Sequence, residues 1–468
     1  MPGFRDECAI FGIWGDPEAS RMTYLGLYAQ QHRGQESSGI VSLKEDGGTH
    51  LVHKGLGLVG DVYTEEHLSG LVGSAAIGHN RYSTTGANLI ANAQPLTANL
   101  RSGPVAIAHN GNIINGSQLR EALITRGSIF QGSNDTEVVL HLLSRNSSAD
   151  VIRCLKEAAN ELVGAYSFVI MTHDRLIAMR DPLGFRPLVL GSRKLEDGSS
   201  ATVLASETCA LDLIGADLVR EIEPGEIFWV DKDGQHSERL AVKGEKAATA
   251  HCVFEHVYFS RPDSVVFGKS VYEARKSMGR ELARESAVDA DMVIPVPDSG
   301  LPAALGYSGE SGLPFELGII RNHYIGRTFI QPSQSIRSFG VKIKLNPQSK
   351  VLAGKRVVVI DDSLVRGTTS QKVIQLIRHA GAKEVHFRLA SPPTVGSCFY
   401  GVDTPHRSQL IAASKSIEEI GKFIGADTLA YLSPDGMLRA VDASKTRGFC
   451  AACFTGKYPT ELFGADRE

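Results

Sequence analysis

One segment in the second half of the chain constrains the fold more than any other. Four apolar residues (357–360) are followed by an acidic pair, Asp361 and Asp362, and then, after Gly367, by a helical pattern. A fully apolar run of this kind is typical of a strand buried on both faces, and such strands occur in parallel sheets that are covered by helices. The segment therefore predicts a strand–loop–helix unit of an open α/β sheet, where ligands bind beyond the carboxyl ends of the strands.

The loop of this unit has the residues of a sugar-phosphate site. Backbone N–H groups at a helix N-terminus attract phosphate, Gly367 permits close approach, and the hydroxyls of residues 368–370 add donors. Asp361 and Asp362 would repel the same phosphate, so we expect them to accept hydrogen bonds from two vicinal hydroxyls or to hold Mg²⁺. On local pattern alone, the segment could also serve only to cap a helix.

The apolar pattern changes near the middle of the chain. Before it, short apolar runs separated by glycine-containing turns favour an α+β fold with stacked sheets, and we expect this domain to cover residues 8–242. After a polar connection near residues 241–247, apolar strands alternate with helices, which favours a parallel α/β domain. We expect the second domain to cover residues 250–468.

The overall composition excludes several classes of protein. Lys and Arg number 49 and Asp and Glu number 52, so the formal net charge of -3 gives no basic field to attract nucleic acid. No run reaches the roughly 18 to 20 apolar residues that cross a bilayer, and the charged start lacks the apolar region of a signal peptide. Seven cysteines are too few for a disulfide framework. We expect a cytoplasmic protein without nucleic-acid or membrane partners.

The segment 357–370 resembles the ribose-phosphate signature of the type I phosphoribosyltransferase family. The resemblance implies phosphoribosyl pyrophosphate (PRPP) as substrate, with pyrophosphate held by a second loop, for which residues 294–300 have the matching position. A basic and aromatic stretch over residues 321–334 fits a lid that closes on anions, although alone it fits an ordinary exposed loop equally well. The implied PRPP-binding residues are Asp298, Ser299, Gly300, Tyr324, Arg327, Asp361, Asp362, Ser363, Arg366, Gly367, Thr368, Thr369 and Ser370, and the implied ligands of one Mg²⁺ per subunit are Ser299, Asp361 and Asp362.

In the first half, Cys8 precedes an apolar run and, taken alone, fits a structural core residue. Polar clusters downstream change this interpretation. Their order resembles the N-terminal-nucleophile glutamine amidotransferase family from Cys8 to about residue 230, which implies a sandwich of stacked antiparallel sheets with helices. One departure is Ala9, which stands where relatives commonly carry glycine. The clusters are residues 31–39, 78–84, 108–112 and 133–137.

A terminal cysteine suits hydrolysis of the glutamine side-chain amide because it carries both a thiol nucleophile and an α-amine. The α-amine has a pKa of about 7.7 and can act as a general base. The resemblance therefore implies that residues 1–7 are a propeptide, which we expect to be removed by autocatalytic cleavage at the bond between Glu7 and Cys8. The active chain would then begin at the catalytic residue Cys8.

The remaining roles follow from the charges of the amide substrate. The Asn110 side chain and the Gly111 N–H are neutral donors suited to the developing oxyanion. Arg81 suits the α-carboxylate of glutamine and Asp135 its α-ammonium, while Arg33 is expected to shape the glutamine-binding pocket.

Four further cysteines form a candidate metal site. The spacing of Cys450 and Cys453 alone does not separate a metal knuckle from a redox pair or two buried thiols. Together with Cys252 and Cys398, the surrounding segments resemble the cluster-binding subclass of the glutamine PRPP amidotransferases. Four thiolates can hold zinc or a [4Fe-4S] cluster, and the resemblance implies one such cluster per subunit in a structural and oxygen-sensing role.

Over residues 8–460 the chain resembles the amidophosphoribosyltransferase family, in its iron-sulfur-containing subclass. The implied reaction converts PRPP, glutamine and water into 5-phosphoribosylamine, glutamate and pyrophosphate, the first committed step of de novo purine biosynthesis, with ammonia passed between the two sites. The resemblance also implies purine nucleotide inhibitors and a homotetramer or homodimer. Two alternatives are another glutamine-dependent transferase and a non-catalytic sensor of PRPP or nucleotides.

Overall fold

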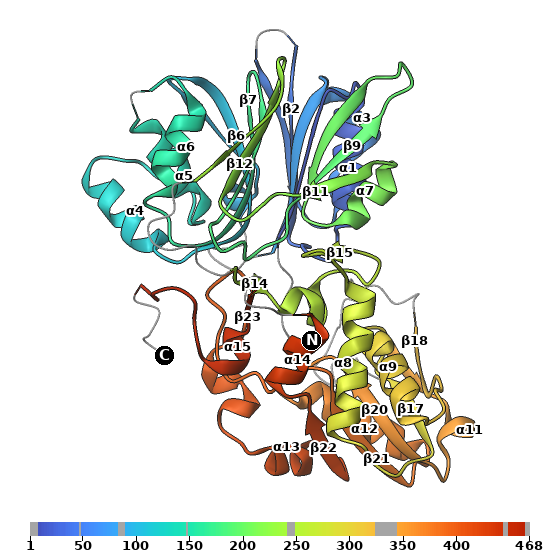
Figure 1. The fold of residues 1–468 in the computed structure, drawn as a ribbon. Coiled ribbons are helices and arrows are strands. Elements are labelled where there is room, and N and C mark those ends of the chain that lie inside the picture. The colour runs from blue at the N-terminus through green and yellow to red at the C-terminus, as the bar shows by residue number, and fades with distance from the viewer. Residues whose placement is uncertain are drawn as a thin grey trace.

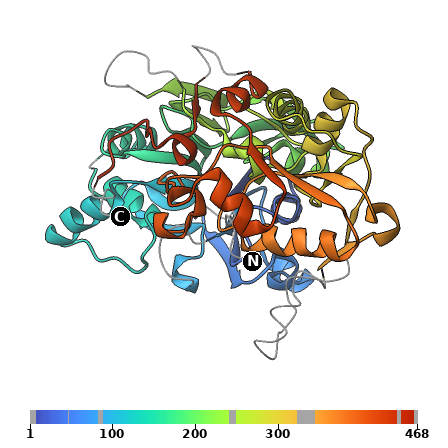
Figure 2. The ribbon, with the colours of Figure 1, turned by 90° about the horizontal axis from the view of Figure 1, so that it is seen from below.

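The computed structural model describes residues 8–45, 48–82, 89–146, 148–240, 249–322, 344–442 and 448–463. The first half of the chain, up to residue 240, forms the upper lobe in Figure 1, and the second half, from residue 249, forms the lower lobe. Seen from below, the yellow to red elements of the second half lie across part of the first half (Figure 2). The propeptide expected over residues 1–7 and the connection expected near 241–247 lie outside the described residues.

Seven antiparallel strands form the first sheet, in the order β11-β9-β10-β1-β4-β2-β3. Helices α1 and α7 cover its outer face, where Phe11 packs with Leu27 and Leu211. The strands are β1 (Ala9–Trp14), β2 (Ser37–Leu43), β3 (His50–Leu56), β4 (Ala75–Arg81), β9 (Val189–Lys194), β10 (Ser200–Ala205) and β11 (Asp217–Glu221), and the helices are α1 (Ala19–Ala29) and α7 (Thr208–Ile214).

Six antiparallel strands form the second sheet, in the order β13-β12-β8-β7-β6-β5. Two helices, α5 and α6, bury their apolar faces against its outer side, where Val139 and Leu155 lie with Ile170. The elements are β5 (Leu96–Leu100), β6 (Gly103–Ile113), β7 (Gly164–Thr172), β8 (Leu176–Arg180), β12 (Glu226–Asp231), β13 (Gly234–Arg239), α5 (Thr136–Ser144) and α6 (Val151–Ala159).

The two sheets pack face to face around a shared apolar core. Successive residues of a strand point to opposite faces, so Ile10 lies in this inner core while Phe11 faces the outer helices. Ile10 packs there with Val169 and Leu176 of the second sheet. The α+β sandwich of antiparallel sheets predicted from the sequence is confirmed.

The second half contains a four-stranded parallel sheet in the order β17-β20-β21-β22. Alternation along β20 buries Val358 under helices α8 and α9 and Val359 under α12 and α13, which explains why the whole strand is apolar. The predicted parallel α/β fold is thus confirmed. Its elements are β17 (Met292–Pro295), β20 (Arg356–Asp361), β21 (Glu384–Leu389), β22 (Thr428–Tyr431), α8 (Val271–Glu285), α9 (Leu301–Ser311), α12 (Thr368–His379) and α13 (Ile417–Ile424).

A short parallel pair, β14 (His251–Cys252) with β23 (Phe449–Cys450), and the π-helical turn η2 (Glu255–Phe259) lie where the two halves meet (Figure 1). No helix among the described residues is long and apolar enough to span a membrane. The remaining elements are α2 (Val59–Val62), α3 (Glu65–Gly70), α4 (Gly116–Thr125), α11 (Ser349–Leu352), α14 (Pro434–Ala440), α15 (Ala452–Thr455), η1 (Ile90–Asn92), η3 (Arg407–Gln409), η4 (Ile411–Ala413), β15 (Val265–Val266), β16 (Lys269–Ser270), β18 (Ile319–Arg321) and β19 (Leu345–Pro347).

Candidate active sites

Cys8 lies directly before the central strand β1 and is 8% exposed. Its Sγ is 3.6 Å from the carbonyl oxygen of Tyr82, and its own carbonyl oxygen accepts a hydrogen bond from Nε of Arg33 at 3.1 Å. Ala9 pairs with Asn80 on the antiparallel strand β4. Cys8, one residue before Ala9, and Arg81, one residue after Asn80, therefore lie at the same end of the first sheet. The candidate nucleophile and the candidate carboxylate-binding residue are therefore neighbours.

The candidate oxyanion donors come from β6 of the second sheet. The facing sheets are joined near this point, because Nε2 of His79 on β4 donates a hydrogen bond to the His109 carbonyl oxygen at 3.0 Å. The next residue, Asn110, is 1% exposed, and its side-chain nitrogen has no hydrogen-bond partner among the residues that the structure describes. A buried amide donor without a partner is costly unless a ligand supplies the acceptor, so Asn110 fits a donor kept for a bound substrate.

Asp135 precedes helix α5 and lies next to the same strand. Its Oδ2 accepts a hydrogen bond from the Ile113 backbone N–H at 2.8 Å and lies 3.7 Å from Nδ1 of His109. Burial opposes ionisation, but the influence of His109 and these hydrogen bonds leave the pKa of the Asp135 carboxyl below its ordinary value. Asp135 therefore remains a carboxylate that can attract an ammonium group.

Arg33 has a different environment from the one that its expected role suggests. Its guanidinium is buried in a cluster of ion pairs, where Nη1 is 2.6 Å from Glu207 Oε1 and Nη2 is 2.8 Å from Glu255 Oε1. Direct contact between Arg33 and glutamine stays a prediction. We did not single out Glu255 from the sequence, although a charged residue inside the apolar run 252–259 was the signal that could have revealed it.

The second candidate site lies at the carboxyl ends of β17 and β20. These strands are parallel and pair Pro295 with Ile360, so the loops that follow them are adjacent. The Ser299 hydroxyl lies 3.5 Å from Asp361 Oδ1, and the Ser363 hydroxyl donates to Asp362 Oδ2 at 2.6 Å. The structure thus brings together the three residues expected to ligate Mg²⁺, namely Ser299, Asp361 and Asp362.

The acidic pair is buried, with Asp361 9% exposed and Asp362 7% exposed. Burial and the neighbouring Asp362 carboxylate raise the pKa of Asp361 well above its ordinary value. A cation beside the pair would relieve this repulsion, and Mg²⁺ is commonly held by one or two carboxylates together with water and substrate phosphates. In the part of the chain that the structure describes, no three or more His, Cys, Asp or Glu residues form a group that could hold a metal ion.

Each of the two loops contains a glycine where a Cβ would be crowded. Gly367 has φ +75° at the start of α12, and a Cβ there would lie 3.1 Å from the Phe423 ring. A Cβ on Gly300 would lie 2.3 Å from the Ile360 carbonyl oxygen.

Asp298 forms an ion pair with Arg321, and Arg366 donates a hydrogen bond to Gln409. Of the expected PRPP-binding residues, Tyr324 and Arg327 lie outside the described residues, and Thr368, Thr369 and Ser370 form the first turn of α12.

The four candidate cluster ligands come from three separate segments that meet at the junction. Cys252 and Cys450 are direct partners in the β14–β23 pair. The Cys453 carbonyl oxygen accepts hydrogen bonds from the N–H groups of Val395 at 2.9 Å and Gly396 at 3.1 Å, two to three residues before Cys398. Burial and the three other cysteines raise the pKa of the Cys453 thiol well above its ordinary value. The structure thus brings the three segments together, although among the described residues no three or more of these side chains are placed to hold a metal ion.

A small cavity of about 150 Å³ lies between the two halves. It is lined by Asn112 of β6 and by residues 397–406 of the second half. A Cβ on Gly401 would lie 3.0 Å from the Gly111 carbonyl carbon, so the second half touches the strand that carries the candidate oxyanion donors.

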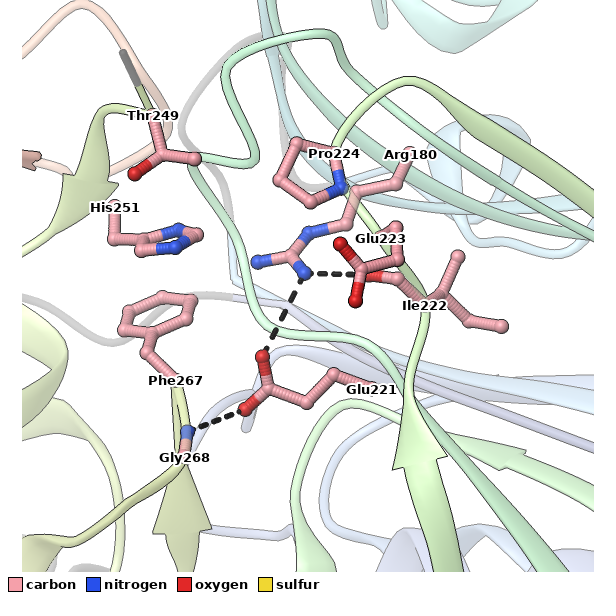
Figure 3. A pocket seen from close by; sticks show the side chains of 9 residues that line it. All are labelled: Arg180, Glu221, Ile222, Glu223, Pro224, Thr249, His251, Phe267 and Gly268. Atoms are coloured by element: carbon pink, nitrogen blue, oxygen red, sulfur yellow. Dashed lines mark hydrogen bonds and ion pairs between the residues drawn. The ribbon is translucent and has the colours of Figure 1, made fainter. Parts of the chain in front are cut away.

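A cavity of about 320 Å³ lies elsewhere at the junction (Figure 3). Arg180 reaches into its middle, where Nη1 donates a hydrogen bond to the Ile222 carbonyl oxygen at 2.6 Å and lies 3.9 Å from Glu221 Oε2. The Gly268 N–H donates to Glu221 Oε1 at 2.8 Å. None of the residues expected to carry the chemistry lines this cavity.

Comparisons with known proteins agree with this arrangement. Residues 79–212 match the glutamine amidotransferase domain and residues 271–390 match the phosphoribosyl transferase domain. The chain is 54% identical over 457 residues to amidophosphoribosyltransferase 1, chloroplastic, of Arabidopsis thaliana, covering 98% of this chain and 79% of the relative. It is 48% identical over 467 residues to the amidophosphoribosyltransferase of Bacillus subtilis, covering 99% of this chain and 96% of the relative.

Solved structures show the same similarity over nearly the whole chain. Glutamine PRPP amidotransferase from Bacillus subtilis, complexed with ADP and GMP, matches with a TM-score of 0.90 and 48% identity and covers 98% of both chains. A structure described as the allosteric regulatory enzyme of purine biosynthesis matches with a TM-score of 0.91 and 48% identity, covering 98% of this chain and 97% of the other.

Proposed function

The chain belongs to the amidophosphoribosyltransferase family, and we propose that its two halves act in sequence to make 5-phosphoribosylamine, glutamate and pyrophosphate from PRPP, glutamine and water. In the family this is the first committed step of de novo purine biosynthesis. The observation that carries the proposal is the contact between Gly401 of the second half and Gly111 of the first, because it joins the strand of the candidate glutaminase to the half that would use its ammonia.

In the first half, the Cys8 thiol would attack the side-chain amide of glutamine, which releases ammonia and leaves a thioester that water hydrolyses to glutamate and free Cys8. Once autocatalytic cleavage has released residues 1–7, the α-amine of Cys8 would take the thiol proton and later pass it to the leaving ammonia. The unpartnered Asn110 amide supports a role as oxyanion donor together with the Gly111 N–H. Arg81 and Asp135 would hold the charged groups of the substrate.

In the second half, the Asp361–Asp362 pair would accept hydrogen bonds from the ribose hydroxyls while the first turn of α12 binds the 5-phosphate. The loop 296–300 would hold pyrophosphate. Ser299, Asp361 and Asp362 would hold one Mg²⁺, which neutralises the charge of the departing pyrophosphate when bound. Ammonia would then bond to the anomeric carbon as the bond to pyrophosphate breaks.

Ammonia that entered bulk water would be lost mainly as ammonium, so transfer between the sites requires a protected route. The cavity between Asn112 and residues 397–406 supports a route at the junction. We propose that ammonia released near Asn110 crosses this junction into the second half.

Cys252, Cys398, Cys450 and Cys453 would hold one [4Fe-4S] cluster per subunit. The pairing of Cys252 with Cys450, and the hydrogen bonds from Val395 and Gly396 to the Cys453 carbonyl oxygen, support this proposal because they bring the three cysteine-bearing segments together. When bound, the cluster would fix the three segments of the junction to one another.

The remaining proposals concern partners and location. The Bacillus subtilis relative was solved with ADP and GMP, which supports purine nucleotides as inhibitors of this chain. We propose a homotetramer or homodimer in the cytoplasm, although the plant relatives are chloroplastic.

Pyrophosphate release from Mg²⁺-PRPP by anaerobically prepared protein tests the function. We expect the parent protein to release pyrophosphate with glutamine and with ammonium chloride. We expect Cys8→Ala to lose only the glutamine-dependent rate. Release with ammonium only would contradict an active glutaminase, and no release with either nitrogen source would favour the sensor.

A further inference from the structure

Four charged side chains are buried together where the two halves meet. Arg33, Arg186 and Glu207 come from the first half, and Glu255 comes from the second. The Arg33 guanidinium makes three close contacts with the two carboxylates, at 2.6 Å from Glu207 Oε1, 2.9 Å from Glu255 Oε2 and 2.8 Å from Glu255 Oε1. This is a two-pronged contact between Arg33 and Glu255, which fixes the plane of the guanidinium.

The third nitrogen of the same guanidinium faces the candidate nucleophile. Nε of Arg33 donates to the Cys8 carbonyl oxygen at 3.1 Å. Arg33 is therefore held on one edge by a residue of the second half and itself holds the backbone of Cys8 with its other edge. Glu255 and the backbone of Cys8 are thus linked through the single side chain of Arg33.

The charges in the cluster balance only when Glu255 is ionised. Two guanidinium groups, on Arg33 and Arg186, face two carboxylates, on Glu207 and Glu255. His32 adds a partly exposed imidazole 2.7 Å from Glu207. Removing one partner from a buried ion pair leaves an uncompensated charge, so loss of the Glu255 charge would drive Arg33 to change its position.

Glu255 is itself held from the second half. The Ser260 hydroxyl donates to Glu255 Oε2 at 2.6 Å. Arg275 of α8 donates from Nε to the His256 carbonyl oxygen at 2.9 Å and from Nη2 to the Ser260 carbonyl oxygen at 2.8 Å, which fixes the turn η2 at both ends. The Arg275 guanidinium also interacts electrostatically with Asp362 of the candidate PRPP site.

We propose that Glu255 is a positioning residue for glutamine hydrolysis, which holds Arg33 against the backbone of Cys8 so that the nucleophile is correctly placed only when η2 of the second half is docked. This inference rests on the proposed glutaminase. Glu255 does not touch substrate, and its effect passes through Arg33.

The test compares Glu255→Gln with Glu226→Gln in the full-length holoenzyme. Glu226 is a matched control because it is also buried and ion-paired, to Arg220 at 2.7 Å, but lies on β12 away from Cys8. For each protein we would measure kcat and KM for glutamine, the ammonium-dependent rate of pyrophosphate release, and the rate at which a glutamine-like diazoketone alkylates Cys8.

We expect Glu255→Gln to lower the glutamine-dependent kcat and the alkylation rate at least about tenfold, with an ammonium-dependent rate within about twofold of the parent and no effect of Glu226→Gln. Unchanged glutamine kinetics in Glu255→Gln would overturn the inference. If Glu255→Gln loses both activities, the second variant Ser260→Ala is measured in the same way. A selective loss of its glutamine-dependent rate supports the inference, and an equal loss or no loss of both rates overturns it. A parent protein inactive with glutamine but active with ammonium would instead refute the proposed glutaminase.

Discussion

Asn112 of the first half donates a hydrogen bond from Nδ2 to the carbonyl oxygen of Phe399 in the second half, at a distance of 2.9 Å. Asn112 is two residues beyond Asn110 on β6, and Phe399 follows Cys398. One hydrogen bond therefore joins the strand of the candidate oxyanion donors to the loop of a candidate cluster ligand. This proximity suggests that changes at the junction will reach the glutamine site.

Asn110→Ala tests the oxyanion donor. The variant removes a buried amide whose nitrogen has no partner in the described part of the chain, so we expect little loss of stability but a drop of about 10²- to 10³-fold in the glutamine-dependent kcat. The ammonium-dependent rate serves as the internal control and should stay within about twofold. Steady-state pyrophosphate release with each nitrogen source measures both, and an equal fall in the two rates would contradict the assignment.

Gly401→Ala tests the contact between the halves. At φ +107° a Cβ would lie 3.0 Å from the Gly111 carbonyl carbon, so the loop must move away from β6. We expect glutamate release to continue while phosphoribosylamine formed per glutamate falls to less than about half of the parent ratio.

Gly425→Ala is the matched control for that prediction. Gly425 also has a positive φ, +82°, but a Cβ there meets nothing within 4 Å. The variant therefore introduces similar backbone strain without pressing on β6. An equal change of the product ratio in the two variants would show that the junction contact has no special role.

We predict that the four cysteines hold an iron-sulfur cluster rather than zinc, as the family resemblance implies. Anaerobically purified protein should contain about four irons and four sulfides per chain by chemical analysis. Cys450→Ser should lower both contents by more than half and lower the melting temperature, whereas Cys154→Ser, which changes a buried cysteine of α6, should leave the iron content unchanged. One zinc per chain without iron would contradict the prediction.

His79 predicts a specific pH dependence of stability. Burial lowers the pKa of His79 to about 3, while an unfolded histidine has a pKa of about 6.5. The unfolded chain therefore binds one more proton between these values, and stability falls as the pH is lowered through this window by at most about 1.4 kcal/mol per pH unit from this residue.

The measurement is urea unfolding of the parent and of His79→Gln at several values between about pH 6 and pH 4. The variant retains a side-chain donor for the His109 carbonyl oxygen but cannot titrate. Because other groups titrate equally in both proteins, the difference between the two slopes isolates His79. Parallel pH profiles would contradict a buried neutral imidazole.

Local patterns were sufficient to predict the elements that position the second site. The apolar run 357–360 forms most of β20, and the helical pattern expected after Gly367 is α12. The helix begins at Thr368 because Gly367, with its positive φ, ends the loop directly before it. Such features depend on neighbouring residues and are therefore visible in the sequence.

The buried cluster could not be predicted in the same way. Arg33 and Glu255 are 222 residues apart, and each lies in a segment whose local pattern says nothing about the other. The ion pair exists because the two halves pack against each other, which is a property of the whole fold. The unpartnered nitrogen of Asn110 likewise required the positions of all surrounding atoms.

The central claim is that nitrogen passes from glutamine to PRPP without mixing with ammonia in solution. The most direct test supplies amide-¹⁵N glutamine together with excess unlabelled ammonium, at a pH low enough that free ammonia in solution does not compete with glutamine as the nitrogen source. The ¹⁵N content of the trapped phosphoribosylamine is then measured. We expect the product to carry predominantly ¹⁵N in the parent protein. A product whose ¹⁵N fraction equals that of the ammonia pool in solution would contradict the claim.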